Sequence, residues 1–423
     1  MTAHKDFKIA IVGTCDTKLE ELLYLCDYIS ALSKSSDTSP FSITPVLINT
    51  GKPSQSSNHP KIAISIHSLL SASNKYTTRN DLITAIGGAL KSYLLELERN
   101  NEVHGVLAVG GSCGSSIASN TLQSLSFGFP KILLSTMASG DIKPYVGCSD
   151  TSVLYSVVDI AGLNSILKQV LQNAAGAIVG MVRAQNSLRI ADSSSTKNKK
   201  VAITMFGITT PACNAAREFL ERSGCEVYVF HATGSGGMAM EKLILEGTFE
   251  GVLDLTTTEL ADEAFGGILS AGSERLKGGA KMGIPMVVST GALDCINFGP
   301  MESLPEKYQK RKIYVHNSSV TVIRTTADEN KRLGEIICTR LIENSTRGKN
   351  QKVEVWLPLR STSMIDQTEP SFRDEEANKA LHDSIIDGLS GTEVDVVKKD
   401  LNINDKGFAE GAAAALLRLM ALE

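Results

Sequence analysis

Short apolar runs that end in small polar residues recur along the chain, and segments with helical periodicity separate them. The first run, residues 8–12 (KIAIV), is continuously apolar, which is typical of a strand buried on both faces of a parallel sheet. The loop GTCDTK follows it, and apolar residues then repeat at helical spacing from Leu19 to Ile29. Because the same order returns at residues 45–48, 105–109 and 132–134, we predict several strand–loop–helix units.

The same pattern restarts after residue 200, with apolar runs at 201–205, 226–230, 251–255 and 285–289. Four segments of the two halves match in order: GTCDT with GITTP, LINTGKPS with FHATGSGG, GVLAVGGSC with GVLDLTTTE, and ILLST with MVVST. We interpret these matches as a degenerate internal repeat, that is, as two related domains. In such sheets ligands bind outside the carboxyl ends of the strands, where all of these loops are expected to lie.

The predicted fold class is therefore α/β, with two Rossmann-like, doubly wound parallel-sheet subdomains joined by a linker. A chain of 423 residues exceeds one ordinary core, which favours two domains. Apolar periodicity is lost in residues 186–200 (NSLRIADSSSTKNKK), which we predict to be the linker. The N-terminal subdomain is then 1–185, a nucleotide-binding unit, and the second subdomain is 201–423.

Composition excludes several classes of protein. The net charge is −4 and no basic cluster is interleaved with aromatic residues, so direct nucleic-acid binding is not expected. The eight cysteines form no C-x-x-C pair and no H-E-x-x-H occurs, which argues against a zinc site. The N-terminus lacks the apolar segment of a signal peptide, and no run approaches the ~20 apolar residues of a membrane span. We expect a cytoplasmic protein with free thiols and no membrane association.

The stretch GVLAVGGSCGSSIASNTLQSL, residues 105–125, is open to three interpretations. Gly110, Gly111 and Gly114 remove side chains where backbone N–H groups converge at a helix N-terminus, which favours phosphate binding. The same residues fit the G-x-S-x-G form of a nucleophile elbow, with Ser112 as the nucleophile of a serine hydrolase. The third interpretation is a tight strand-to-helix turn with Ser115 as the helix N-cap.

Two enzyme alternatives follow from other residues. A hydrolase would need a triad of Ser112 with Asp150 or Asp254 and a histidine, His231 or His316, but no oxyanion segment of the H-G-G-G type occurs. The segment from Gly234 to Ala239 (GSGGMA) fits G-x-G-x-x-A, and Asp254 stands twenty residues further on, as in an NAD-binding fingerprint. That segment follows the second strand of its half, however, whereas the fingerprint belongs after the first.

Two features bear on metal and phosphate binding. Asp16, Asp150 and Asp254 are predicted at strand ends, where carboxylates can hold Mg²⁺ beside phosphates, although helix capping is the commoner role of Asp16 and Asp150. The loop after residue 48 contains Gly51-Lys52 but lacks the earlier glycine of a Walker A loop, because Val46 stands there.

An amphipathic helix is predicted at residues 82–97, and Gly87 and Gly88 interrupt it. Each glycine costs about 1 kcal/mol relative to alanine in a helix interior, so close packing or a binding partner is expected there. We hypothesise that the exposed face of this helix, including Thr84 and Lys91, belongs to a partner surface.

The segments KIAIVGTCDTKLEEL, VLAVGGSCGSS, MFGITTPACNAAREFLE and HATGSGGMAMEKL resemble a family of plant, fungal and bacterial proteins with a two-part ATP-binding domain. The family includes an inhibitor of tobamovirus RNA replication, and the resemblance covers the whole chain. It implies two Rossmann-like subdomains with ATP near their junction, a homodimer, and binding to the helicase domain of a viral replication protein. It also implies a further TIM-barrel-like domain, so we expect the end at Glu423 to be a truncation.

The resemblance further implies which residues contact the cofactor. We expect ATP, with Mg²⁺ as an accompanying ion, and an antiviral role without turnover, because no catalytic base is identifiable. The expected ATP contacts are the residues of the matching loops: Thr17, Lys18, Gly51, Gly110, Gly111, Ser112, Gly114, Ser115, Thr233, Gly234, Ser235, Gly236 and Thr257.

Overall fold

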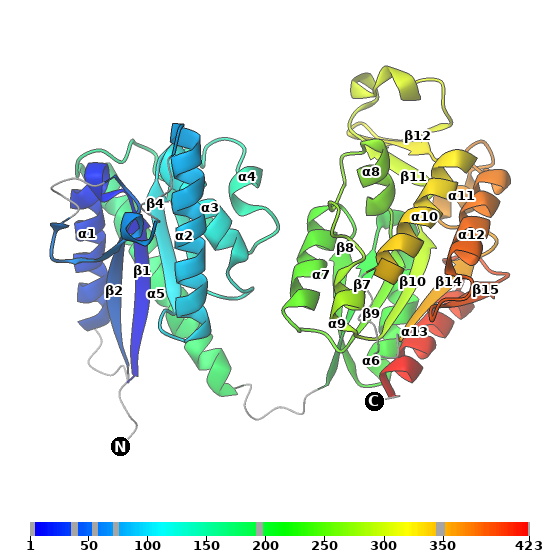
Figure 1. Ribbon diagram of the computed structural model, residues 1–423, viewed down its shortest axis with the longest axis horizontal. Coiled ribbons are helices and arrows are strands. Elements are labelled where there is room, and N and C mark those ends of the chain that lie inside the picture. The colour runs from blue at the N-terminus through cyan, green and yellow to red at the C-terminus, as the bar shows by residue number, and fades with distance from the viewer. Residues whose placement is uncertain are drawn as a thin grey trace. The chain divides into compact units, whose positions relative to one another are not determined.

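The structure is a computed structural model of the chain, and it describes residues 5–34, 41–52, 58–70, 76–191, 198–343 and 352–421. The chain divides into two compact units, unit 1 comprising residues 1–195 and unit 2 comprising residues 196–423 (Figure 1). Each unit has its own sheet and its own hydrophobic core.

Unit 1 is built on a six-stranded sheet in which every pair of neighbouring strands is parallel. The spatial order is β3-β2-β1-β4-β5-β6, which is the order of the dinucleotide-binding fold. From β1 to β3 the chain adds strands on one side of β1, and from β4 to β6 it adds them on the other side. A ligand-binding crevice is therefore expected outside the carboxyl ends of β1 and β4, where the order of addition changes side. The strands are β1 (Lys5–Gly13), β2 (Phe41–Asn49), β3 (Ile62–Ser65), β4 (Gly105–Gly110), β5 (Lys131–Ser135) and β6 (Ser152–Tyr155).

Helices cover both faces of this sheet (Figure 1). On one face, α1 (Cys15–Lys34) and α5 (Ser165–Ala191) bury leucine and isoleucine side chains against alternate residues of β1, β4 and β5. On the other face, α2 (Arg79–Arg99) and α3 (Ser112–Ser124) pack on the intervening residues. The central strands are buried on both sides, which explains their continuous apolar runs. A 3₁₀ turn, η2 (Ile66–Leu69), follows β3, and a short α4 spans Lys143–Val146.

Unit 2 also contains a six-stranded parallel sheet, in the order β15-β14-β10-β9-β7-β8. Its core also has two layers, with α6 and α13 packed on one face and α7, α8, α10 and α12 on the other. The strands are β7 (Lys199–Met205), β8 (Cys225–His231), β9 (Gly251–Thr256), β10 (Met286–Gly291), β14 (Val353–Pro358) and β15 (Asp395–Lys399). The helices include α6 (Thr210–Arg222), α7 (Ser235–Leu245), α8 (Glu259–Phe265), α9 (Gly278–Met282), α10 (Ala327–Glu343), α11 (Met364–Thr368), α12 (Glu375–Leu389) and α13 (Lys406–Ala421).

A small antiparallel sheet is added to unit 2 and was not predicted from the sequence. It consists of β11 (Cys295–Phe298), β13 (Val320–Arg324) and β12 (Ile313–Asn317), in that spatial order. The 3₁₀ turns η4 (Gly207–Thr209), η5 (Met301–Ser303) and η6 (Glu306–Tyr308) complete the unit.

The internal repeat read from the sequence has a counterpart in the topology. The four matched strands of unit 1 lie in the order β2-β1-β4-β5, and their counterparts in unit 2 lie in the order β8-β7-β9-β10. The predicted class of two doubly wound parallel α/β sheets is therefore confirmed.

The boundaries differ from the predictions in two places. Helix α5 begins at Ser165 and continues to Ala191, and β7 already begins at Lys199, so regular structure occupies both ends of the segment 186–200 predicted as linker. Residues 192–197 of that segment lie outside the described residues. Helix α3 begins at Ser112 with Gly111 as its N-cap, so Ser115 is not the capping residue.

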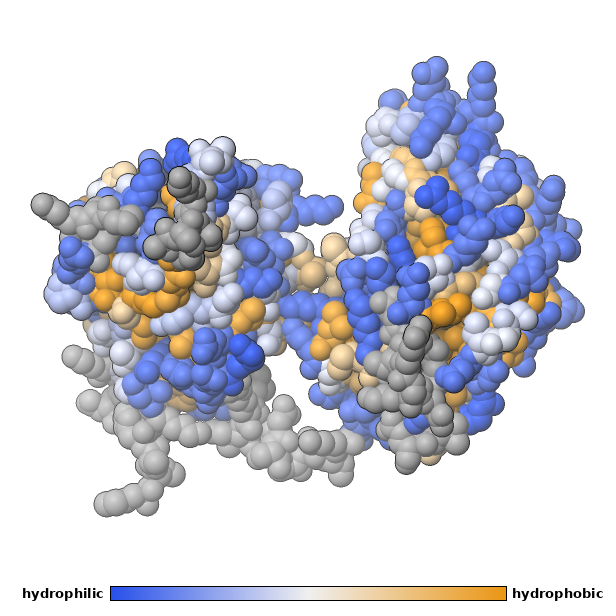
Figure 2. Space-filling model, in the orientation of Figure 1, coloured by the Kyte–Doolittle hydropathy of each residue, from blue (hydrophilic) through white to orange (hydrophobic). Residues whose placement is uncertain are grey.

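In the described ranges, no helix is both long and apolar enough to cross a bilayer. Figure 2 shows hydrophilic residues over much of the visible face of each unit, with smaller hydrophobic areas between them.

The two glycines of α2 have different surroundings, which gives a matched pair of stability predictions. A Cβ atom at Gly87 would lie 3.3 Å from the carbonyl oxygen of Ile117 on α3, whereas at Gly88 it would meet nothing within 4 Å. We expect Gly88→Ala to raise the free energy of unfolding of unit 1 by about 0.5–1 kcal/mol, because alanine loses less backbone entropy on folding. Gly87→Ala should give a smaller gain or a loss, because α2 and α3 must separate by a few tenths of an ångström to admit the Cβ atom. Urea denaturation of both variants checks the prediction, and equal effects would contradict it.

Candidate functional site

In unit 1, the turn from β4 into α3 is held close to the strand end by its glycines. A Cβ atom at Gly110 would lie 2.8 Å from the Cα of Gly114 and 3.0 Å from the backbone nitrogen of Ser115, so only glycine permits this approach. Ser115 is buried, and its hydroxyl lies 2.6 Å from that of Ser135 at the end of β5. Ser115, one of the expected ATP contacts, thus ties α3 to the neighbouring strand through its hydroxyl group.

The N-terminus of α3 is not capped by a side chain. Its N-cap is Gly111, which has no side chain, and the first intrahelical bond runs from the Ser115 N–H to the Gly111 carbonyl oxygen over 2.8 Å. The N–H groups of Ser112, Cys113 and Gly114 therefore have no partner within the helix. Ser112 is exposed, and the aligned peptide dipoles give this end about half a positive charge. An anion is favoured at this position.

The segments that follow β1 and β2 place a carboxylate, that of Asp16, close to the backbone of Gly51 at this edge of the sheet. Asp16, in the first turn of α1, lies beside Gly51, where a Cβ atom would be only 2.0 Å from the Asp16 Oδ1 atom. Asn49, at the end of β2, orders this corner, because its Oδ1 accepts hydrogen bonds from the backbone N–H of Cys15 (2.9 Å) and of Gly51 (2.8 Å). Gly51 thus makes room for the Asp16 carboxylate.

Two polar atoms near this corner are buried without a partner. Among the described residues, neither Asp16 Oδ1 nor His67 Nε2 has a hydrogen-bond partner. His67 lies on η2, directly after β3. Burial lowers the pKa of His67, although the nearby Asp16 works in the opposite direction, so the imidazole is neutral at pH 7. Buried polar groups are normally paired, and two such atoms at one edge of a sheet are consistent with a ligand or ordered water there.

The remaining predicted contacts of unit 1 lie at the same edge but have other partners. The Lys18 ammonium donates a 2.7 Å hydrogen bond to the carbonyl oxygen of Ile160, in the segment after β6, and this contact helps to hold α1. The Thr17 hydroxyl lies 3.1 Å from that of Thr14. Thr17 is exposed and remains accessible to a ligand.

The hydrolase alternative finds no support in unit 1. Ser112 is the first residue of α3, and its hydroxyl makes no hydrogen bond to a histidine among the described residues. Asp150 pairs with Lys131, the first residue of β5, and accepts a 2.7 Å hydrogen bond from the Gly128 N–H. Asp150 therefore lies at the opposite end of the sheet from Ser112, so it is placed neither to complete a triad with Ser112 nor to hold Mg²⁺ beside the N-terminus of α3.

In unit 2, the glycine-rich N-terminus of α7 is capped by a side chain of the same unit. One carboxylate oxygen of Glu259, from the first turn of α8, accepts hydrogen bonds from the N–H groups of Gly234 (2.6 Å) and Gly237 (3.1 Å). A Cβ atom at Gly237 would lie 2.1 Å from the other oxygen. Gly236 has a packing role, because its Cβ would lie 1.9 Å from the His231 carbonyl oxygen. The position that a phosphate would take is filled by Glu259.

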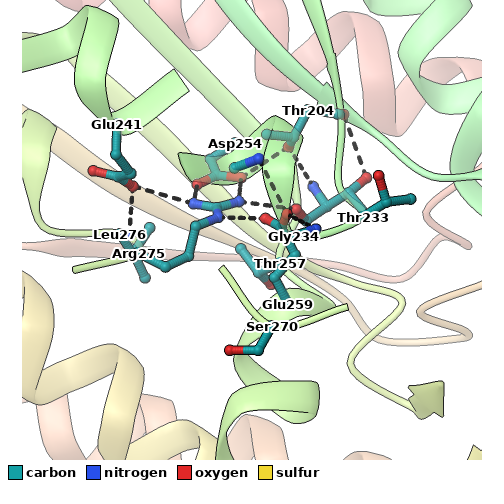
Figure 3. Close-up of polar contacts among 12 residues, drawn as sticks. Thr204, Thr233, Gly234, Glu241, Asp254, Thr257, Glu259, Ser270, Arg275 and Leu276 are labelled. Carbon is teal, nitrogen blue, oxygen red and sulfur yellow. Dashed lines mark hydrogen bonds and ion pairs between the residues drawn. The ribbon is translucent and has the colours of Figure 1, made fainter. Parts of the chain in front are cut away.

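Glu259 belongs to a buried charge network centred on Arg275 (Figure 3). The fully buried Arg275 guanidinium binds Asp254 through two nitrogens (2.5 and 2.7 Å), Glu259 (2.7 Å) and Glu241 (3.4 Å). Burial raises the pKa of both glutamates, and Arg275 opposes that shift. Burial disfavours the charge of Arg275, but Asp254 and the glutamates outweigh it and hold the Arg275 pKa above its usual value.

This network leaves no dinucleotide site at the GSGGMA segment. Asp254, the candidate ribose ligand, is fully buried and also accepts a 2.8 Å hydrogen bond from Thr204. Thr257 is buried and donates to the Ser289 carbonyl oxygen over 2.9 Å. Of the predicted contacts in unit 2, the side chain of Ser235 is exposed and that of Thr233 is half-buried.

Sequence reasoning missed Arg275, Glu241 and Glu259. The sequence offered one signal, because Glu259 in the segment TTTEL comes shortly after a strand predicted to be buried. Its ion pair with Arg275, sixteen residues later, could not be predicted without the three-dimensional structure. Within the described ranges, no group of three or more His, Cys, Asp or Glu side chains is arranged to hold a metal ion.

The two parallel sheets, each with a repeated set of loops at its carboxyl edge, define a two-domain α/β protein. The N-terminus of α3 has no side-chain cap, whereas that of α7 is capped by Glu259. The chain belongs to the uncharacterised protein family UPF0261: residues 7–187 match its N-terminal domain and residues 198–420 its C-terminal domain.

Relatives from bacteria and plants match almost the whole chain. A UPF0261 protein of Clostridium tetani is 39% identical over 418 residues, which is 98% of this chain and 99% of that protein. The ToMV resistance protein Tm-1 of Solanum lycopersicum is 37% identical over 428 residues, which is 97% of this chain but 56% of the tomato protein. The resemblance to a family that includes a tomato tobamovirus-resistance protein is therefore confirmed. The match to a solved UDP-N-acetylglucosamine 2-epimerase of Rickettsia bellii covers 67% of this chain and 79% of the epimerase chain, at 13% identity and with a TM-score of 0.23.

Proposed function

We propose that the chain binds ATP at the carboxyl edge of the unit 1 sheet, with the phosphates at the N-terminus of α3. The observation that carries this proposal is the contrast between two helix ends. The amides of α7 are occupied by the Glu259 carboxylate, whereas those of Ser112, Cys113 and Gly114 in α3 have neither a helix partner nor a capping side chain among the described residues. Because β1 and β4 flank the topological switch point, this is also the edge where such folds bind ligands.

A magnesium ion fits the same edge. Asp16 supplies a carboxylate, the kind of oxygen ligand that Mg²⁺ prefers, and its buried Oδ1 atom has no partner among the described residues. Asp254 does not fit, because Arg275 and Thr204 occupy both of its oxygens, and Asp150 lies at the wrong end of its sheet. When bound, Mg²⁺ would neutralise phosphate charge beside Asp16. The role of the chain's own residues is binding, and we assign no catalytic residue.

A thermal-shift panel tests the proposed ligand. Because a ligand that binds only the folded state stabilises it by mass action, ATP with Mg²⁺ should raise the melting temperature more than GTP, NAD or NADP does. Without Mg²⁺ the ATP effect should be smaller, and Asp16→Asn should reduce the difference. A larger shift with NAD than with ATP, or no shift with any nucleotide, would contradict the proposal.

We further propose that the ATP-bound protein inhibits tobamovirus RNA replication by binding the helicase domain of the replication protein, as a homodimer. Support comes from the 37% identity to the tomato resistance protein over 97% of this chain.

On α2, the residues Asn80, Thr84, Gly88, Ser92 and Glu96 are exposed at intervals of four and form one stripe, whereas Lys91 is half-buried. We propose this stripe as the contact surface; it keeps Thr84 from the surface hypothesised from the sequence and leaves out Lys91.

A binding assay with charge-neutral bulky variants tests this surface. Thr84→Tyr combined with Ser92→Tyr should weaken capture of a tobamovirus helicase domain, because the new side chains stand on the proposed contact face. The control is Gln169→Tyr combined with Asn173→Tyr, two exposed neutral positions on α5, which covers the other face of the sheet; it should leave capture unchanged. Light scattering reports the oligomeric state of each variant. Undiminished capture by the double variant would exclude the α2 stripe as the contact surface.

A further inference from the structure

Unit 2 contains a cavity of about 440 Å³ that none of the predicted sites uses. It lies where β14 and β15 end, with Arg360 following β14 and Lys398 on β15, and α12 forms its other wall. Its volume falls within the ~300–1,000 Å³ range of small-molecule sites. The carboxyl ends of parallel strands are where α/β folds bind ligands, and this location is independent of the site proposed in unit 1.

The mouth of the cavity carries an excess of positive charge. Arg360, Arg373, Lys379 and Lys398 line it, against two acidic residues, Glu375 and Asp383. Arg360 pairs with Asp400 (3.0 Å), Arg373 with Glu375 (2.9 Å) and Lys379 with Asp383. Lys398 has no ion-pair partner among the described residues.

These ion pairs do not prevent an anion from binding. All of their side chains are substantially exposed, from 41% for Arg373 to 79% for Glu375, and exposed pairs contribute only about 0–1 kcal/mol each. A ligand anion can therefore replace the acidic partners at little cost. Arginine in particular binds phosphate through two parallel N–H groups.

Two polar residues that line the cavity, His382 and Asn378, are almost fully buried. His382 is only 5% exposed, and among the described residues its Nε2 atom has no hydrogen-bond partner. Burial lowers its pKa to about 4, so the imidazole is neutral at pH 7 and its Nε2 atom either donates or accepts a hydrogen bond, according to the tautomer. Asn378 beside it is held in place, since its amide donates to Asp366 (2.8 Å) and its oxygen accepts from Arg324 (2.6 Å).

We propose that this cavity binds a small phosphate ester, with the phosphate group at the Arg360, Arg373, Lys379 and Lys398 rim and the uncharged part of the molecule against Asn378 and His382. The rim supplies the charge that selects a phosphate. The unpartnered Nε2 of His382 supplies a polar contact for a hydroxyl group, and the volume admits more than an inorganic ion.

Calorimetric titration of the full chain with glycerol 3-phosphate, and with glycerol as the neutral comparison, tests the proposal. Arg360→Ala combined with Lys398→Ala should weaken glycerol 3-phosphate binding about tenfold or more, because two charge-assisted contacts are lost. The control variant is Arg222→Ala combined with Lys281→Ala, which removes the same charge from unit 2 outside the cavity and should bind as the wild type does. His382→Leu, which keeps the buried volume, should weaken glycerol 3-phosphate more than inorganic phosphate.

The outcomes separate this site from the one in unit 1. Gly111→Asp, which alters the α3 N-terminus, should leave glycerol 3-phosphate binding unchanged. Absence of saturable binding by the wild type at millimolar ligand, equal weakening in the cavity and control variants, or loss of binding only with Gly111→Asp would each overturn the proposal. Circular dichroism and melting curves establish that each variant is folded.

Discussion

Arg275→Met is expected to lower the free energy of unfolding of unit 2 by about 3–5 kcal/mol, which is a large part of the stability of an ordinary domain. The reason is that Arg275 compensates Asp254, Glu259 and Glu241, three carboxylates with side chains no more than 8% exposed. Methionine matches the aliphatic part of arginine but leaves these carboxylates without a counter-charge. Denaturant unfolding of the wild type and the variant measures the difference.

The pH dependence distinguishes this cause from lost packing. Without Arg275, the carboxyl groups gain protons more readily in the folded state than in the unfolded state, so folding takes up protons and the variant gains stability as the pH falls. The destabilisation should therefore be smaller at pH 5 than at pH 8. Arg217→Met, which removes an arginine with 41% of its side chain exposed and paired at 3.6 Å with Glu221, should change stability by less than about 0.5 kcal/mol. A pH-independent loss, or one as small as the control, would contradict the assignment.

The topology could be predicted because its signals are local. The apolar runs of β1, β4, β9 and β10 each fill strands buried on both faces, and their loops carry the small residues that a strand-to-helix turn requires. The antiparallel sheet of β11, β12 and β13 was missed, because each strand has only four or five residues. In the described segment 295–324, no α-helix separates these strands to mark them as strand–loop–helix units. Its strands pair with one another and not with the parallel sheet.

The glycine patterns predicted where loops lie, but not which helix N-terminus is capped by a side chain of the same unit. The glycines of the β4–α3 turn and of the segment before α7 look alike in sequence, and both allow backbone atoms to approach closely. The difference between them depends on Glu259, which is more than twenty residues from Gly234 and reaches its amide only in the folded chain. Asp254 shows the same limit, because its spacing suits a ribose while its partner, Arg275, is visible only in three dimensions.

The contrast between the two helix ends leads to the sharpest test of the ATP site, the substitution Gly111→Asp. Gly111 has extended backbone angles (φ −85°, ψ −158°), and a Cβ atom there would meet only Thr136 Oγ1 at 3.6 Å, so aspartate fits without strain. Its carboxylate would bind the amides at the start of α3 in the way that Glu259 binds those of α7. As an N-cap in place of glycine, it should stabilise unit 1 by a few tenths of a kcal/mol.

The same substitution should abolish ATP binding, because the carboxylate occupies the amides and repels the phosphates. Two readouts therefore move in opposite directions: the melting temperature without ligand rises, while the further rise on adding ATP with Mg²⁺ disappears. Gly111→Ala introduces the same Cβ atom without the charge and should retain the ATP-dependent rise. An ATP response that survives in Gly111→Asp would show that the phosphates bind elsewhere, whereas loss of the response in both variants would point to steric disturbance of the turn. Only charge-dependent loss fits an anion held by the start of α3.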